Sequence, residues 1–421
     1  MRRKKTIFAL TLLLAGVGGL WIAGPPPLET GVYVQRVTTD GATIAKVDEH
    51  ARRLTVRIWA EGDGANPIVV SEDAVVVEHA IRVDGLRQGT RYEFVLEADG
   101  VRVDEGTFRT APVGDDVPVR FAAVGDSGQL PWWYSMHRMG WSRIRPALAW
   151  TSTPQQWHVA EWIDAQDLHF FVHLGDIVYW RQLRDAHEEA FFRPFAAMLR
   201  DTPLYALIGN HDVPRDGGPP PFENLFHNPS PKGVGRPNRN FTAAWGSVRL
   251  IGLDVVDPDW EKGPVRGWLE KTLSAATEPW IVVATHTPCF TAYQKRTEAP
   301  ALRDVLYPLL AKHGVDLVMS GDDHHFVRFK PSSPDGPIQV VVGAGGKSLY
   351  EVKQHDTRVA ASASTWSFLF VEAAGLRLDV RVMGAAGDES LLDGFTIDRT
   401  KGALPTTISA GRRARIERLR K

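Results

Sequence analysis

The chain has 421 residues, of which 43% are hydrophobic and 24% are charged. This length suits two or three domains, and the composition excludes a wholly disordered chain, a collagen and a protein with many membrane spans. A single cysteine, Cys289, excludes an internal disulfide and a cysteine-based zinc cluster. Basic residues gather at both ends, so the body between them is acidic although the formal net charge is only −1. That balance excludes a general nucleic-acid-binding surface.

The first 23 residues predict an export signal. Residues 2–5 are all basic, and residues 6–23 are almost wholly apolar, which is the order found in signal peptides. Because the apolar run also reaches the lower length limit of a membrane span, a cleaved signal peptide and a retained signal anchor both stay open. In either case the basic end remains in the cytoplasm. We therefore expect an extracytoplasmic protein that is secreted, periplasmic or attached to the membrane through this segment.

A Pro-rich spacer at residues 24–27 precedes a stretch of short β-strands over residues 28–112. Alternating apolar and polar residues predict strands at 32–37, 42–47, 54–59, 75–83, 92–98 and 106–110. This pattern is typical of a small all-β sandwich. Residues 86–92, which end in Tyr92, resemble the corner before the penultimate strand of fibronectin type III domains. The resemblance implies a fibronectin- or immunoglobulin-like domain in which the Tyr92 hydroxyl bonds back to the main chain.

A larger domain follows over residues 118–398, where short apolar runs alternate with segments of helical spacing. Helices are expected at 156–165, 186–199, 265–275 and 301–313. Strands are expected at 119–124, 170–174, 204–208, 249–253, 280–284, 317–319, 338–342, 368–372 and 376–382. The alternation predicts a layered α/β (mixed α+β) domain. The basic residues 400–421 predict a solvated or disordered tail, with contact to an anionic membrane surface as the alternative.

Two longer segments interrupt this alternation. Residues 213–240 are rich in Pro and Gly and predict a loop. Residues 130–157 are rich in tryptophan. We interpret these tryptophans as core packing, with an aromatic lid or a lipid-facing patch as the alternative.

Five of the expected strands end in short polar loops of one chemical type. The loops read Gly-Asp-Ser-Gly at 125–128, Gly-Asp-Ile-Val-Tyr at 175–179, Gly-Asn-His-Asp at 209–212, Thr-His-Thr-Pro at 285–288 and Gly-Asp-Asp-His at 321–324. Sites in α/β sheets form at the carboxyl ends of strands. Oxygen and imidazole donors without thiols suit iron, manganese, zinc or magnesium. One such loop alone is an ordinary turn, but five in order predict a metal centre.

The ordered set resembles the calcineurin-like metallophosphoesterases, and more narrowly the purple acid phosphatases. The general family has a histidine two residues after the first aspartate, where this chain has Gly128. Purple acid phosphatases make the same change and supply a tyrosine, here Tyr179. The resemblance implies a ferric ion held by Asp126, Asp176, Tyr179 and His324. It implies a second, divalent ion (iron, manganese or zinc) held by Asp176, Asn210, His286 and Asp322.

Asp322 departs from the family pattern, which has histidine at this position. A carboxylate still binds metal, but it lowers the net charge of the centre. A less positive centre is expected to attract phosphate less strongly and to acidify a bound water less. It is also expected to favour manganese or ferrous iron over zinc.

These features predict hydrolysis of a small phosphorylated substrate, a phosphate monoester, by attack of a metal-bound hydroxide. One alternative is a phosphodiesterase that acts on nucleotides or lipid headgroups with the same metal site. The other is a non-catalytic binding protein that no longer binds the second metal, because Asp322 replaces the histidine. Relative rates on monoesters and diesters separate the first two, and metal content separates the third.

Beyond the metal ligands, two sets of residues are expected to act on the substrate. His211, which lies beside the expected ligand Asn210, is expected to protonate the leaving group, and the neighbouring Asp212 to orient its ring. The alternative for His211 is a purely structural turn residue. The loop after His286 is expected to contact the substrate phosphate through its two adjacent cations. These cations are Lys295 and Arg296, and His325, which follows His324 in the fifth loop, is predicted as a further substrate contact.

Overall fold

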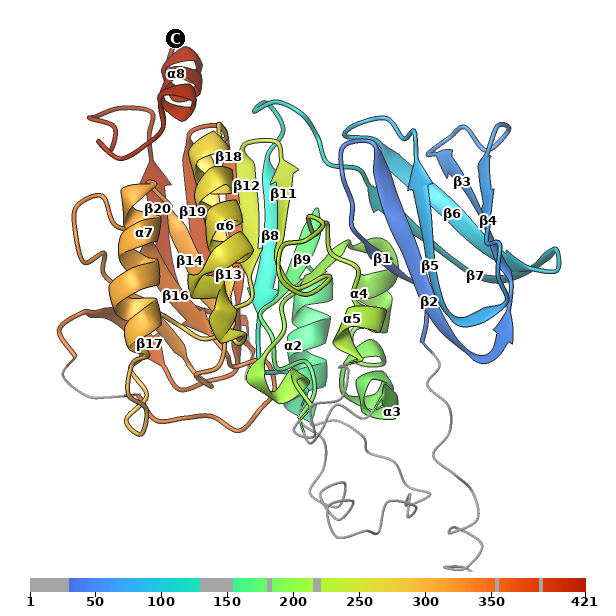
Figure 1. Cartoon of the computed structure of the whole chain (residues 1–421), viewed down its shortest axis with the longest axis horizontal. Coiled ribbons are helices and arrows are strands. Elements are labelled where there is room, and N and C mark those ends of the chain that lie inside the picture. Colours follow the sequence, from blue (N-terminus) through green and yellow to red (C-terminus); the bar gives the residue numbers. More distant parts are fainter. Residues whose placement is uncertain (1–29, 129–153, 180–183, 215–220, 353–355, 386–388) are drawn as a thin grey trace, which may run out of the picture.

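The computed structural model describes residues 30–128, 154–179, 184–214, 221–352, 356–385 and 389–421. Two sheets pack face to face in the larger domain, and helices cover their outer faces (Figure 1). The predicted export segment, the spacer and most of the Trp-rich segment lie outside the described residues. Among the helices in these ranges, none is both long enough and apolar enough to cross a membrane.

The first sheet has nine strands in the order β20-β19-β18-β8-β9-β10-β1-β2-β5. In the larger domain these are β8 (Val119–Val124), β9 (Phe170–His173), β10 (Leu204–Ala206), β18 (Ser367–Ala374), β19 (Arg377–Ala385) and β20 (Glu389–Asp398). The neighbours β8, β9 and β10 run parallel. In β8, Phe121 packs in the core between the sheets while Ala122 packs toward the helices. Both faces are therefore buried, which explains why the run is continuously apolar.

The second sheet has seven strands in the order β11-β12-β13-β14-β16-β15-β17. They are β11 (Phe241–Trp245), β12 (Val248–Leu253), β13 (Trp280–Thr285), β14 (Leu317–Ser320), β15 (Phe326–Phe329), β16 (Ile338–Val342) and β17 (Val359–Ala363). The central strands β12, β13, β14 and β16 are parallel. Their carboxyl ends consequently lie along one edge, as do those of β8, β9 and β10.

Helices cover each sheet from outside. On the first sheet they are α2 (Pro154–Asp164), α3 (Arg184–His187), η2 (Glu188–Phe192), α4 (Ala196–Asp201) and α5 (Phe222–Leu225). On the second they are η4 (Pro258–Glu261), α6 (Gly263–Ala275), η5 (Ala301–Leu306) and α7 (Tyr307–Lys312). The helices predicted at 186–199 and 301–313 are interrupted, because each contains a π-helical turn, η2 and η5.

The N-terminal domain is a β-sandwich that shares a sheet with the larger domain. Its strands are β1 (Tyr33–Gln35), β2 (Gly41–Arg52), β3 (Leu54–Ala60), β4 (Ile68–Ser71), β5 (Val76–Asp84), β6 (Arg91–Ala98) and β7 (Val101–Arg109). Strands β1, β2 and β5 extend the first sheet, because β1 pairs parallel with β10 at Gln35 and Leu204. The other four form a separate sheet. The backbone N–H of Arg87 donates to the Tyr92 hydroxyl at 2.8 Å, as the tyrosine-corner resemblance implied.

A buried charge cluster holds β2 to β5 in this domain. The His79 side chain is 1% exposed. Its Nε2 lies 3.2 Å from Asp48 Oδ2, and its Nδ1 lies 2.7 Å from Glu72 Oε2. Arg52 binds the same Asp48 carboxylate at 2.5 Å through Nε. The cluster therefore balances buried charge of both signs.

The C-terminal residues form an ordered helix, which corrects the prediction of a disordered tail. Helix α8 (Ala410–Leu419) begins after Ser409, whose side chain accepts from the Arg412 backbone N–H. The Arg412 side chain is completely buried and binds Asp316 and the carbonyl oxygens of Pro279 and Gly314. The tail was misread because its charge pattern looks solvated, whereas this arginine is bound in the interior. These contacts place α8 where β13 and β14 begin, opposite their carboxyl ends (Figure 1).

Candidate metal centre

The five polar loops meet at the carboxyl edge of the two facing sheets. Asp126 follows β8, Asp176 follows β9, and η3 (Asn210–Asp212) follows β10. From the opposite sheet, His286 follows β13 and Asp322 follows β14. The parallel register of both sets of strands makes this convergence a consequence of topology.

Three of the predicted ligands have an unusual backbone. Asp126, Asp176 and Asp322 have φ values of 59°, 52° and 66°, in the left-handed region. Among the described residues, only three other non-glycine residues share this conformation. Left-handed aspartates cost free energy, and such residues gather where function requires a particular side-chain direction. The backbone thus turns all three carboxylates into one space.

Gly128 occupies a position where a side chain does not fit. A Cβ added there would lie 1.8 Å from the carbonyl oxygen of Ile177. The Gly128 carbonyl also accepts the Tyr179 backbone N–H at 3.2 Å. The close approach of the two loops therefore excludes histidine at 128 and at the same time positions the tyrosine.

The residues predicted for the first metal form one contact group. The Tyr179 hydroxyl donates to Asp126 Oδ1 at 2.7 Å and lies 3.1 Å from His324 Nε2. The same His324 nitrogen lies 3.4 Å from Asp126 Oδ1. Because His324 Nδ1 is 2.8 Å from the Ser348 carbonyl, it carries the hydrogen, and the Nε2 lone pair faces the aspartate and the tyrosine.

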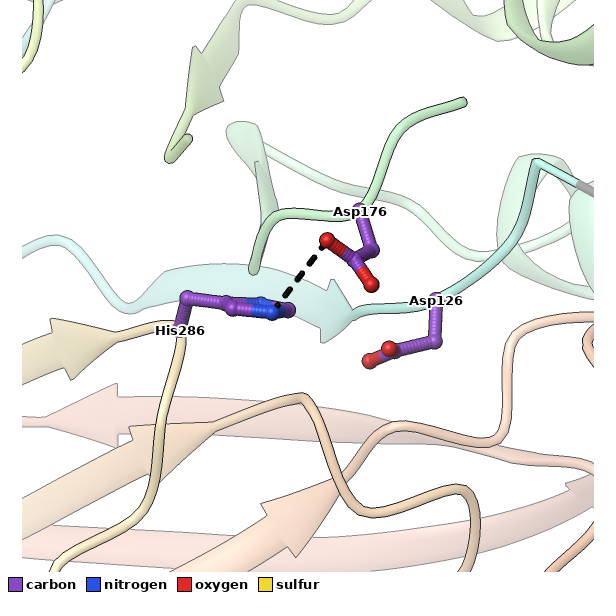
Figure 2. A group of neighbouring side chains, drawn as sticks. All are labelled: Asp126, Asp176 and His286. Atoms are coloured by element: carbon purple, nitrogen blue, oxygen red, sulfur yellow. Dashed lines mark ion pairs between the residues drawn. The ribbon is translucent and has the colours of Figure 1, made fainter. Parts of the chain in front are cut away.

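The residues predicted for the second metal form an adjoining group. His286 Nδ1 donates to the Leu174 carbonyl at 2.8 Å, which leaves Nε2 as the acceptor. That nitrogen lies 3.1 Å from Asn210 Oδ1, 3.3 Å from Asp176 Oδ1 and 3.8 Å from Asp322 Oδ1. Figure 2 shows His286 facing Asp176, with Asp126 beside them. One donor atom each from Asp126, Asp176 and His286 lies within 4.8 Å of the others.

The electrostatics of this cluster suit a bound cation. Asp126, Asp176 and His286 are at most 1% exposed. Burial and the neighbouring Asp126 raise the pKa of Asp176 well above its usual value. Burial would lower the pKa of His286, but the charges of Asp176, Asp322 and Asp126 raise it to about 9. Burial and nearby carboxylates also raise the pKa of Tyr179. Metal cations would compensate the buried negative charge and favour the phenolate, so the residues fit a metal pair.

Comparison with known proteins identifies the domain. Residues 119–326 match the family model described as calcineurin-like phosphoesterase. This region is a calcineurin-like phosphoesterase domain. Purple acid phosphatase 21 of Arabidopsis thaliana is 24% identical over 329 residues, covering 73% of this chain and 67% of the relative. Tartrate-resistant acid phosphatase type 5 of Rattus norvegicus is 26% identical over 311 residues, covering 66% of this chain and 89% of the relative.

The fold of this phosphoesterase is that of a solved purple acid phosphatase. The structure of purple acid phosphatase PPD1 from yellow lupin (Lupinus luteus) seeds superposes with a TM-score of 0.74 at 19% identity, covering 89% of this chain and 75% of the other. The predicted mixed α/β metallophosphoesterase fold is therefore confirmed. The family match and the relatives identify the chain as a metal-dependent phosphoester hydrolase, from a family that uses binuclear metal centres.

Asp322 of the phosphoesterase domain is not a free carboxylate. Arg296 Nη2 donates to Asp322 Oδ1 at 2.7 Å, and Nη1 lies 2.5 Å from Oδ2. The same Nη1 lies 3.0 Å from Asp323 Oδ1. The structure thus brings Arg296 into the centre, whereas Lys295 beside it is exposed on the surface.

The other predicted active-site residues differ in their surroundings. The His211 side chain is 40% exposed, its Nε2 lies 4.0 Å from Asp176 Oδ2, and its ring packs on Tyr179 with centroids 4.7 Å apart. The Asp212 carboxylate accepts backbone N–H groups of Gly209, Ile177 and Val178. Its contacts therefore hold together the loops that carry Asp176 and Asn210.

His325 does not lie where a substrate can reach it, which corrects the prediction of a substrate contact. Its side chain is 0% exposed, and its Nε2 lies 3.9 Å from Asp323 Oδ2. Burial lowers the pKa of this ring to about 4. A fully buried imidazole does not contact an incoming anion.

Sequence reasoning missed Lys347. Its Nζ lies 4.3 Å from the centroid of the Tyr179 ring, and its backbone N–H donates to the Asp126 carbonyl at 3.0 Å. Lys347 belongs to the Gly345-Gly346-Lys347 loop after β16, which runs parallel to β14. The sequence therefore offered a signal for Lys347, because this loop is a sixth polar loop that follows an apolar strand.

Proposed function

We propose that the chain is an exported phosphatase that hydrolyses phosphate monoesters at a two-metal centre. The observation that carries this proposal is the convergence of two contact groups, around Asp126 and around Asp176, from five loops on two sheets. Each group combines buried oxygen donors with a histidine whose Nε2 is directed inward. The proposed ligand set is Asp126, Asp176, Tyr179, Asn210, His286, Asp322 and His324.

The metals would supply activation of water and a positive clamp for the phosphoryl oxygens. The protein contributes the shape of the site. Asp176 lies between the two groups, so it is the residue suited to join both ions. Hydrogen bonds to main-chain carbonyls fix the rings of His286 and His324. The loops are held together by Asp212, so the donors are in place before a substrate arrives.

His211 would act on the leaving group. It is the partly exposed histidine of the centre, and packing on Tyr179 restricts its ring. A proton on Nε2 can pass to the departing alkoxide oxygen, and the imidazole then regains a proton from water. Arg296 and Lys347 add positive charge beside the donors, which suits a phosphate group with two negative charges.

We further propose the metals and the location that the sequence indicates. Tyr179 favours a ferric ion at the Asp126 group, and a divalent iron, manganese or zinc ion is proposed at the Asn210 group. The basic and apolar residues 1–23 support export, with the phosphatase domain outside the cytoplasm. A small phosphorylated molecule is the proposed substrate.

Metal analysis, a visible spectrum and an ester screen test this proposal. Protein lacking residues 1–27 is expected to hold two metals per chain and to absorb visible light through a tyrosinate–ferric transition. It should cleave p-nitrophenyl phosphate faster than bis-p-nitrophenyl phosphate. Asp176→Asn should lose both metal and turnover. Faster cleavage of the diester would refute the monoester proposal, and a metal-free, inactive protein would refute the phosphatase proposal. Recovery of the full chain in the cytoplasmic fraction would refute export.

A further inference from the structure

The position where the family has a metal-binding histidine is occupied here by an ion pair. Both carboxylate oxygens of Asp322 are engaged by Arg296, one through Nη2 at 2.7 Å and one through Nη1 at 2.5 Å. The Arg296 side chain is 28% exposed and the Asp322 side chain is 10% exposed. The pair still faces the centre, because Asp322 Oδ1 lies 3.8 Å from His286 Nε2.

A second carboxylate also contacts the guanidinium. Arg296 Nη1 lies 3.0 Å from Oδ1 of Asp323, which is 0% exposed. The Thr291 hydroxyl donates to the other oxygen of Asp323. The Asp322 backbone N–H donates to Asp126 Oδ2 at 2.7 Å, so the pair is bonded to a ligand of the first metal. Arginine, carboxylate and centre are therefore joined by a continuous set of contacts.

The pair changes the charge balance expected from the sequence. A neutral imidazole adds no charge to the centre, and an aspartate alone adds one negative charge. Here the guanidinium, in contact with both oxygens, cancels that charge. The pair as a whole therefore carries the same net charge as the imidazole it replaces.

We infer that Arg296 and Asp322 together replace the histidine, and that Arg296 sets the balance between cation and phosphate binding at the second metal position. The inference rests on the proposed function. Arg296 competes with a divalent cation for the Asp322 carboxylate. It also presents positive charge to a phosphate anion at the same place. Its removal should therefore affect the two ligands in opposite directions.

Four variants of the full chain test this role. Arg296→Gln removes the cation, Asp322→His restores the family residue, and the double variant combines both changes. Arg328→Gln is the matched control, because Arg328 also binds a carboxylate through two nitrogens, Nε to Asp393 Oδ2 at 2.6 Å and Nη2 to Oδ1 at 3.1 Å. The side chains of that pair are 22% and 10% exposed. Binding of Mn²⁺ is followed by the EPR signal of the free ion, and binding of inorganic phosphate by calorimetry.

Arg296→Gln should bind Mn²⁺ about tenfold more tightly and phosphate about tenfold more weakly, the effect of one unit charge at close range. Asp322→His should show the reverse. The double variant should return close to the unmodified protein, and Arg328→Gln should leave both affinities unchanged. Affinities that fall together in Arg296→Gln, or that match those of Arg328→Gln, would overturn the inference alone. An unmodified protein that binds neither Mn²⁺ nor phosphate would overturn the proposed function, and the inference with it.

Discussion

The buried arginine of α8 predicts a large effect of a single C-terminal substitution on stability. We consider Arg412→Met, which keeps an unbranched side chain but removes the charge and all its hydrogen bonds. The guanidinium binds Asp316, the Pro279 carbonyl at 2.6 and 3.1 Å, and the Gly314 carbonyl. Burial lowers its pKa to about 10, so it remains charged at neutral pH.

The magnitude follows from what the substitution leaves behind. Breaking a buried ion pair by removing one partner costs about 3–5 kcal/mol. The lower end applies here, because Arg399 also binds Asp316 and donates to the Pro279 carbonyl at 2.7 Å. The Gly314 carbonyl loses its arginine partner. We expect a loss of about 3 kcal/mol in the free energy of unfolding and a fall in Tm of about 5 °C.

Thermal unfolding by circular dichroism measures this effect. Arg418→Met is the control, because Arg418 lies on the same helix and its side chain is exposed. Phosphatase activity at 25 °C should be unchanged in both variants, since α8 lies at the opposite edge from the metal loops. A Tm of Arg412→Met equal to that of the control would show that the tail is solvated and would refute the reasoning.

The pH dependence of stability should report on His79. Burial alone would lower the pKa of this ring, but its contacts with the carboxylates of Asp48 and Glu72 raise it to about 9 from 6.5. The stabilisation by the charged ring is therefore complete below pH 6.5, and up to about 3 kcal/mol is lost as pH rises through 9. Urea titrations from pH 6 to 10 should show this loss, and His79→Gln should flatten it; equal slopes would contradict the assignment. Gly128→Ala should displace the loop that carries Tyr179, because the added Cβ would lie 1.8 Å from the main-chain oxygen of Ile177. We expect the variant to bind less metal and its kcat to fall about 100-fold. Gly267→Ala is the control, because no heavy atom lies within 4 Å of a Cβ added there, and its metal content and kcat should be unchanged. Similar activities of the two variants would contradict the predicted clash at residue 128. Lys347→Met should raise the inhibition constant for inorganic phosphate about three- to tenfold, whereas Lys347→Arg should not. Equal constants for these two variants would show that the charge has no part in phosphate binding.

The sequence predicts the ligand-bearing loops because their positions follow from chain topology. Asp126, Asp176 and His286 each come within three residues of the end of a largely apolar strand, and parallel strands end at the same edge. Their order along the chain is enough to group them. The tyrosine corner at Tyr92 is also predictable from the sequence, because its hydrogen-bond partner Arg87 is only five residues away.

The features that sequence reasoning missed depend on contacts between distant residues or on side-chain direction. The pairing of Arg296 with Asp322 spans 26 residues, and that of Arg412 with Asp316 spans 96. A charge pattern shows such residues as solvated, because nothing local reveals the buried partner. The position of His325 was misjudged because adjacent residues can point to opposite sides of a loop.

The shared sheet makes the N-terminal domain a mechanical part of the phosphoesterase. Strand β1 pairs with β10, and the Tyr205 hydroxyl of β10 donates to the Val37 carbonyl at 2.9 Å. Strand β10 leads into the loop that carries Asn210. A force applied to the N-terminal end of the chain would therefore be transmitted across hydrogen-bonded strands to a proposed metal ligand.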